Sequence, residues 1–188
     1  MSRPLAAGLI FLTNIFSAHA PVMAEEAPAP ALQTSTDYDF PACFDHRGAP
    51  ATYLPNDIGL DKPWAIYFGA RYLDQRNIED PVIFYDPDHM ETLSKAALDF
   101  IFAHECFHLA SGDAYRAYEA MNTSERPGRD EMQEQEDAAD CNAANRMREE
   151  FNYTEEEMRG AIESISGVMN IRKRIPSIMA CYQTPVVS

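Results

Sequence analysis

Apolar residues recur at helical spacing in three stretches of the C-terminal half of the chain. The first stretch begins at Ser94, a residue type that caps helix N-termini, and ends at Gly112, the residue type that most often follows a helix. The second predicts a helix over residues 130–151. The third begins with a capping box at 154–157 and runs to about residue 166. The chain is therefore predicted to be mainly helical here.

Strand signals precede the first of these helices. β-Branched and aromatic residues crowd 81–86, the strongest strand signal in the chain, and a shorter strand is predicted at 51–54. The sequence Asp61-Lys62-Pro63 is typical of a helix start and favours a helix over 62–76. A strand over 65–72 is the alternative. Residues 168–182 stay ambiguous because a proline interrupts them. The predicted fold class is α+β.

The N-terminal 24 residues have the pattern of a secretory signal peptide. Arg3 precedes an apolar run over 5–16 that is too short to span a bilayer, and small residues lead to a cleavage point after Ala24; an uncleaved anchor is the alternative. Residues 25–38, rich in Pro, Ala and Thr, predict a disordered leader before a single domain over 39–188. We expect an exported protein, periplasmic or secreted, without stable membrane insertion after cleavage.

The charge balance excludes one class of partner. The chain carries 30 Asp and Glu against 15 Lys and Arg, a formal net charge of −15. Such a surface repels phosphate backbones and anionic membranes, so nucleic acid is not an expected partner. Solubility explains the charge otherwise, and the oligomeric state is not predicted.

The residues with the clearest chemical meaning are His104-Glu105-Cys106-Phe107-His108, near the end of the first predicted helix. Residues four apart lie on one helix face, so the two histidines can hold one metal ion through their ring nitrogens. The glutamate beside them is placed to take a proton from a water that the metal activates, and zinc is the usual metal for this chemistry. The alternative is a helix whose two histidines have no joint role.

A third protein ligand has to come from elsewhere in the chain. Ser111 and Ala114 occupy the Gly and His positions of the longer motif that supplies a third histidine, so that arrangement is excluded. Glu136 and Asp140 are four apart on the next long helix. We predict that Glu136 binds the metal while Asp140 accepts the N–H of a ligand histidine. Asp113 is the second choice for the third ligand. The helix face proposed for this role comprises Met132, Glu136, Ala139, Asp140, Ala143 and Met147.

The five-residue motif together with Glu136-x-x-x-Asp140 resembles the gluzincin zinc metallopeptidases, most closely small soluble relatives of the CAAX-processing-type proteases. The resemblance covers roughly residues 80–150. It implies a zincin-like fold with one Zn²⁺ per chain. It also implies a small sheet whose edge strand, at about 81–86, precedes the motif helix and pairs with a peptide or protein substrate. It also implies peptide-bond hydrolysis with Glu105 as the general base.

One feature of such an enzyme stays open in the sequence. The sequence does not identify the residue that stabilises the oxyanion. An alternative function therefore remains: a catalytically silent zinc-binding protein that binds a protein partner in the same groove. The candidates for the oxyanion role are Tyr115, Tyr153, Arg172, Arg174 and Tyr182.

Four cysteines, an even number in a chain predicted to be exported, suggest two disulfides. Cys106 lies inside the motif but is turned about 200° from His104, so it is not a predicted ligand. We predict a bond from Cys106 to Cys141 that ties the two ligand helices together, with Cys43–Cys181 as the complementary pair.

Overall fold

The computed structural model describes residues 38–56, 68–75, 78–123, 127–167, 169 and 171–184, and all structural statements below refer to these. The predicted signal peptide and nearly all of the predicted leader lie outside the described residues. Those that are described belong to one compact unit, Thr34–Ser188. The elements, in chain order, are β1 (Thr52–Pro55), β2 (Phe68–Gln75), β3 (Ile78–Tyr85), α1 (Pro87–Met90), α2 (Lys95–Ala110), α3 (Asp113–Thr123), α4 (Arg129–Glu149), α5 (Glu155–Ile165) and α6 (Ile175–Gln183).

The strands form one small sheet with the order β1-β3-β2, which together with the helices confirms the α+β class. β1 runs parallel to β3, and β2 runs antiparallel to it, with Ala70 opposite Ile83. The strand predicted at 81–86 exists as part of β3, but its predicted place at the edge is wrong: it is the central strand. Its continuous apolar run explains this, because residues 82–85 are all buried, as is typical of a strand with neighbours on both sides.

β2 is the edge strand next to the motif helix, and it corrects a second prediction. The sequence favours a helix over 62–76, whereas 68–75 is a strand; residues 62–67 and 76 lie outside the described part of the chain. The alternative strand over 65–72 was therefore the better choice. Antiparallel pairing with β3 along the whole of β2 satisfies its backbone groups on one side, a gain that local sequence signals do not report.

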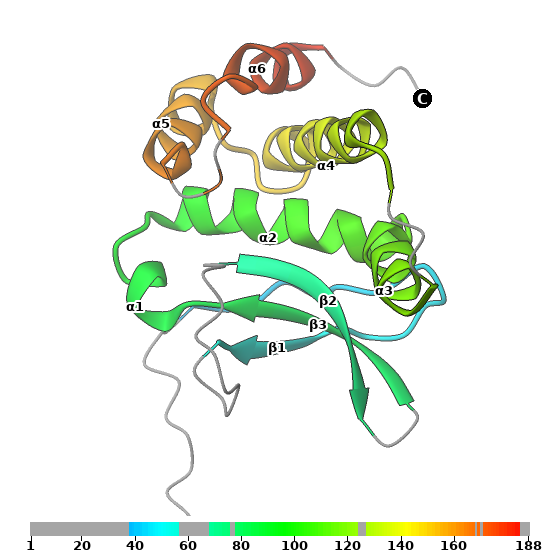
Figure 1. The fold of residues 1–188 in the computed structure, drawn as a ribbon. Helices are drawn as coiled ribbons and strands as arrows, with labels where there is room; N and C mark the ends of the chain where they lie inside the picture. The colour runs from blue at the N-terminus through cyan, green and yellow to red at the C-terminus, as the bar shows by residue number, and fades with distance from the viewer. Residues whose placement is uncertain are drawn as a thin grey trace, which may run out of the picture. The chain divides into compact units, whose positions relative to one another are not determined.

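Helix α2 is the centre of the molecule. It lies between the sheet and the helices α4 and α5, and α6 packs against α4 (Figure 1). Phe100, Ile101 and Phe102 are fully buried, so this helix is covered on several sides and not only along one stripe. His104 and Glu105 are buried in the same helix, which places the motif in the core, between the sheet and the helical layer.

Local signals set the helix boundaries as predicted. The Ser94 side chain accepts from the Ala97 N–H at 3.2 Å, and the α2 helix is followed by Gly112 at a φ of +81°, where a glycine avoids the strain of a side chain. The capping box that opens α5 is present, with Thr154 and Glu157 satisfying each other's backbone N–H groups. The ambiguous segment 168–182 contains most of α6, whose proline occupies the first turn, where no backbone hydrogen bond is lost.

Helix α4 matches the helix predicted over 130–151, and most of its predicted inner face is confirmed. Ala139, Asp140, Ala143 and Met147 are buried, and the small alanines let the helix lie close to α2. Met132 does not belong to this face in the structure, because 46% of its surface is exposed near the start of the helix.

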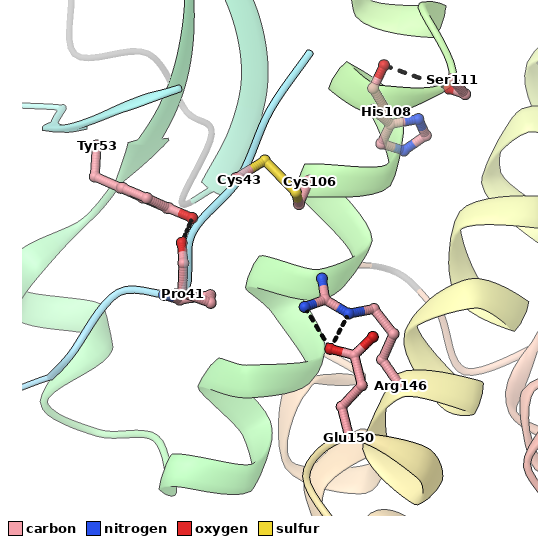
Figure 2. The surroundings of a disulfide bond; sticks show 8 residues. All are labelled: Pro41, Cys43, Tyr53, Cys106, His108, Ser111, Arg146 and Glu150. Atoms are coloured by element: carbon pink, nitrogen blue, oxygen red, sulfur yellow. Dashed lines mark hydrogen bonds and ion pairs between the residues drawn. A yellow bond between two sulfur atoms is a disulfide. The ribbon is translucent and has the colours of Figure 1, made fainter. Parts of the chain in front are cut away.

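Both disulfides differ from the predicted pairing. Cys43 is bonded to Cys106 (Figure 2), and Cys141 is bonded to Cys181. Since Cys106 is turned away from the ligand face of α2, it faces the segment that precedes β1 and not α4. Cys141 is turned about 140° from Glu136 around the α4 axis and faces α6. Each of the two helices is thus bonded to a different segment, and no disulfide joins α2 to α4.

Candidate metal centre

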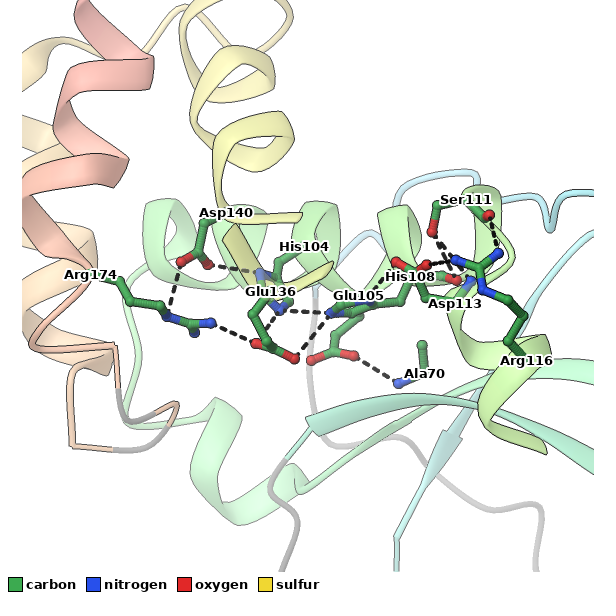
Figure 3. Close-up of polar contacts among 10 residues, drawn as sticks. All are labelled: Ala70, His104, Glu105, His108, Ser111, Asp113, Arg116, Glu136, Asp140 and Arg174. Atoms are coloured by element: carbon green, nitrogen blue, oxygen red, sulfur yellow. Dashed lines mark hydrogen bonds and ion pairs between the residues drawn. The ribbon is translucent and has the colours of Figure 1, made fainter. Parts of the chain in front are cut away.

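Helices α2 and α4 bring three ligand side chains to one point. The Nε2 atoms of His104 and His108 are 3.1 Å apart, as expected for residues one helical turn apart whose side chains leave the same face of α2 (Figure 3). Glu136 reaches across from α4, with Oε2 3.5 Å from Nε2 of His104 and Oε1 3.5 Å from Nε2 of His108. The three predicted ligands therefore form one group that can hold a metal ion.

The spacing of these atoms fits a tetrahedral ion. Ligand atoms about 2.0–2.2 Å from a zinc ion, at tetrahedral angles, lie roughly 3.3–3.6 Å from one another. The separations of 3.1, 3.5 and 3.5 Å are close to this range. Two imidazole lone pairs aimed at each other at 3.1 Å also repel unless a proton or a metal ion lies between them. The geometry and the chemistry of the donor set both favour a cation at this point.

Asp140 orients the first histidine, as its spacing from Glu136 predicts. Its Oδ1 lies 2.9 Å from Nδ1 of His104, and both side chains are almost fully buried. A proton held on Nδ1 by this carboxylate leaves the Nε2 lone pair for the metal. Asp140 therefore stands behind His104, on the side away from the other two ligands.

The pKa of His104 reports how strongly this environment favours positive charge. Burial by itself lowers the pKa of the imidazole. Hydrogen bonds with Asp140 and Glu136, together with the charges of Glu105 and Asp140, outweigh burial and raise it from 6.5 to about 9. For Glu136, burial opposes ionisation, but its contacts with His104 and Arg174 and the charge of His108 lower the pKa to about 2, so this ligand is ionised at neutral pH.

Asp113 plays a different part from the one considered for it in the sequence. Its Oδ2 lies 3.4 Å from Nδ1 of His108, on the opposite side of the ring from the ligand nitrogen. It is buried, and its second oxygen is paired with the guanidinium of Arg116. Asp113 is therefore a partner for His108, as Asp140 is for His104, and it is not placed as a third ligand. The turn at Gly112 brings it back toward α2.

Glu105 lies beside the ligands and is held by the edge strand. Its Oε2 accepts a hydrogen bond from the backbone N–H of Ala70 in β2 at 2.7 Å, and the residue is only 7% exposed (Figure 3). Arg71, the next residue of β2, is also close enough for the charge of Glu105 to act on its pKa, which burial lowers. Sequence reasoning missed the contact with Ala70, because it depends on how the sheet packs against α2.

Four of the five candidates for an oxyanion-stabilising residue have other partners or are exposed to solvent. The hydroxyl of Tyr153 donates to Asp99 at 2.7 Å, and that of Tyr182 donates to the backbone carbonyl of Tyr153. Tyr115 packs against His46 and Tyr72, and Arg172 is exposed. Arg174 is in contact with the site, where it pairs with Glu136 and Asp140.

Comparisons of the chain with models of protein families, with curated proteins and with solved structures found no match. The interpretation of the site accordingly rests on its own residues and distances. Among the described residues, no helix combines the length and the apolar character needed to cross a membrane.

Proposed function

We propose that this protein is an exported zinc metallopeptidase that hydrolyses peptide bonds with Glu105 as general base. The observation that carries the proposal is the convergence of two imidazole nitrogens and the Glu136 carboxylate within 3.5 Å of one another, beside a buried carboxylate that the edge strand holds. A structural metal site needs no such additional carboxylate, whereas hydrolysis needs a base next to the metal.

His104, His108 and Glu136 would hold the ion. Two imidazole nitrogens and one carboxylate are a ligand set typical of catalytic zinc, with three protein ligands and a fourth position left for water or substrate. When bound, zinc supplies Lewis acidity to a substrate carbonyl and lowers the pKa of water.

Glu105 supplies the proton transfer. Its carboxylate takes a proton from the attacking water and passes it to the amine that leaves. The hydrogen bond from Ala70 fixes the orientation of this carboxylate, which removes the cost of ordering it during the reaction. Asp140 and Asp113 keep the two ligand rings in place by binding their Nδ1 atoms.

The sheet offers a way to bind the substrate. β2 pairs with β3 along one side, and the Ala70 N–H reaches the site from β2. An extended peptide bound beside this edge strand would lie next to the metal centre. The predicted signal peptide and the two disulfides support export, because disulfides persist in oxidising compartments.

The test is to compare the wild type with Glu105→Gln. Gln is nearly isosteric and keeps an oxygen that can accept from Ala70, but it cannot take the proton. We expect the variant to fold and bind about one zinc per chain and to lose roughly 10²–10⁴-fold in turnover. Metal analysis, circular dichroism and a mixed peptide library with mass-spectrometric readout measure the three quantities.

Variants of the ligands provide the matched control, since His104→Ala, His108→Ala and Glu136→Ala should lose the zinc itself. Full zinc occupancy in Glu136→Ala would show that the third ligand is elsewhere. Equal turnover by Glu105→Gln and the wild type would remove Glu105 from the mechanism. A wild type that binds zinc and a protein partner but cleaves nothing in the library would favour the alternative function, a catalytically silent zinc-binding protein.

A further inference from the structure

One positive charge lies against the back of the metal centre. Nη1 of Arg174 is 2.8 Å from Oε2 of Glu136, and Nε is 3.1 Å from Oδ2 of Asp140. The same guanidinium thus joins the predicted third ligand to the carboxylate that orients His104 (Figure 3). Its side chain is 13% exposed, so these contacts are made mostly out of water.

Helix α6, whose N-cap is Arg174, is held against α4 by contacts that do not involve the Arg174 side chain. The Arg174 carbonyl accepts the Ile178 N–H at 3.0 Å in the first turn of α6. Further along α6, Cys181 is bonded to Cys141 of α4. Arg148 of α4 donates to the backbone carbonyls at the end of α6. The guanidinium is therefore delivered by a helix whose position on α4 is already set.

Glu136 needs such a partner more than the other ligands do. His104 is almost fully buried and is held by Asp140, whereas 43% of the Glu136 side chain is exposed. An exposed glutamate on a helix surface samples several rotamers, and ordering it costs free energy each time a metal binds. A planar guanidinium that binds two carboxylates at once restricts both, which a single ammonium group cannot do equally well.

We propose that Arg174 is a positioning residue that preorganises Glu136 and Asp140 for metal binding. This inference rests on the metal centre of the proposed function but does not require peptidase activity. It assigns to the start of α6 a role in building a site whose ligands all lie on α2 and α4.

Orientation and charge make opposite predictions, which allows a decisive test. A positive charge near a divalent cation repels it, so its removal should tighten metal binding if charge were the main effect. If Arg174 acts by orienting the carboxylates, its removal should weaken metal binding instead. Loss of such outer partners typically weakens metal binding by roughly 10–100-fold.

The experiment measures the zinc dissociation constant of the full-length protein by competition with a chromophoric chelator. We expect Arg174→Gln to bind zinc roughly 10–100-fold more weakly than the wild type, and Arg174→Lys to fall between them. Arg172→Gln is the matched control, because it removes the same charge from an exposed residue two positions away and should leave the constant unchanged. The lysine variant keeps the charge and so guards against a glutamine variant that fails to fold.

Three results would overturn the inference. Unchanged or tighter zinc binding in both Arg174 variants would show that the residue does not order the ligands. Unchanged zinc binding with reduced turnover would make Arg174 a group that contacts substrate. A wild type that does not bind zinc would refute the metal centre and this inference with it, whereas a wild type that binds zinc without hydrolysing peptides would refute only the proposed enzyme.

Discussion

The stability of the metal-free protein should fall as the pH rises from 6 to 9, while its affinity for zinc should increase over the same interval. His104 is the cause, because its pKa is raised from 6.5 to about 9. A group whose pKa is raised on folding contributes its full stabilisation below the unfolded value, here 6.5. That contribution is lost as the pH rises through the folded value.

The size of the effect follows from the shift. A change from 6.5 to about 9 corresponds to a free energy on the order of 3 kcal/mol, at about 1.4 kcal/mol for each unit. This is a large part of the roughly 5–15 kcal/mol that stabilises a typical domain. With a urea m-value of about 1–3 kcal/mol/M, the unfolding midpoint should fall by roughly 1–3 M between pH 6 and pH 9.

Glu136 acts at the acid end of the same profile. Its pKa is lowered from 4.5 to about 2, so its contribution is present above pH 4.5 and is lost as the pH falls toward 2. A zinc ion at this site would need the neutral imidazole of His104 and would have to displace a proton below pH 9. The zinc affinity should therefore rise by up to about tenfold for each pH unit in this range.

The assay is urea unfolding, followed by circular dichroism, of chelator-treated protein at pH 6, 7, 8 and 9. His104→Gln is the control, and its unfolding midpoint should lose most of this pH dependence. The reasoning is refuted if the wild-type midpoint is the same at pH 6 and pH 9, or if the variant retains the wild-type slope.

Two further predictions concern the surroundings of the ligands. Asp140→Asn and Asp113→Asn should each weaken zinc binding. The loss should be up to roughly 10–100-fold for Asp140, whose contact with its histidine is the shorter of the two. Equal zinc affinity in the wild type and both variants would contradict this. Peptide mapping without reduction should recover Cys43 linked to Cys106. Replacing both with Ser should lower the free energy of unfolding by about 2–5 kcal/mol, and an unchanged urea midpoint would argue against that bond.

The helix boundaries could be predicted because their causes are local. The side chain of Ser94 binds a backbone N–H three residues away, and Thr154 and Glu157 cap each other across the same distance. Gly112 adopts a positive φ that few other residues tolerate. Each of these features depends on residues within about one helical turn of each other, so a short stretch of sequence is enough to predict it.

The sheet was harder to predict, because its stabilisation is not local. The aromatic and aliphatic residues of β2 fit either a helix or a strand, and only pairing with β3 decides between them. Edge and central positions depend in the same way on which strands pair. The apolar run at 82–85 held the one usable signal, since a strand with one exposed face would alternate polar and apolar residues.

The residues of the candidate metal group could be predicted for the same local reason as the helix caps. The spacing of His104 and His108 in one helix, and of Glu136 and Asp140 in another, places each pair on one face. The partners behind them could not all be found in this way. Asp113 reaches His108 only through the turn at Gly112, and Arg174 reaches α4 only because α6 packs there.

The disulfide pairing shows why proximity in sequence to a site misleads. Cys106 follows Glu105, and Cys141 follows Asp140, so both cysteines lie on helices that meet at the metal centre. Successive residues of a helix differ by about 100° in direction, however, and the faces of α2 and α4 that meet are taken by the ligands and Asp140. Each cysteine must therefore point to another neighbour. The disulfide Cys141–Cys181 does not contact the site itself. It holds α6 against α4, and α6 in turn carries Arg174 to Glu136.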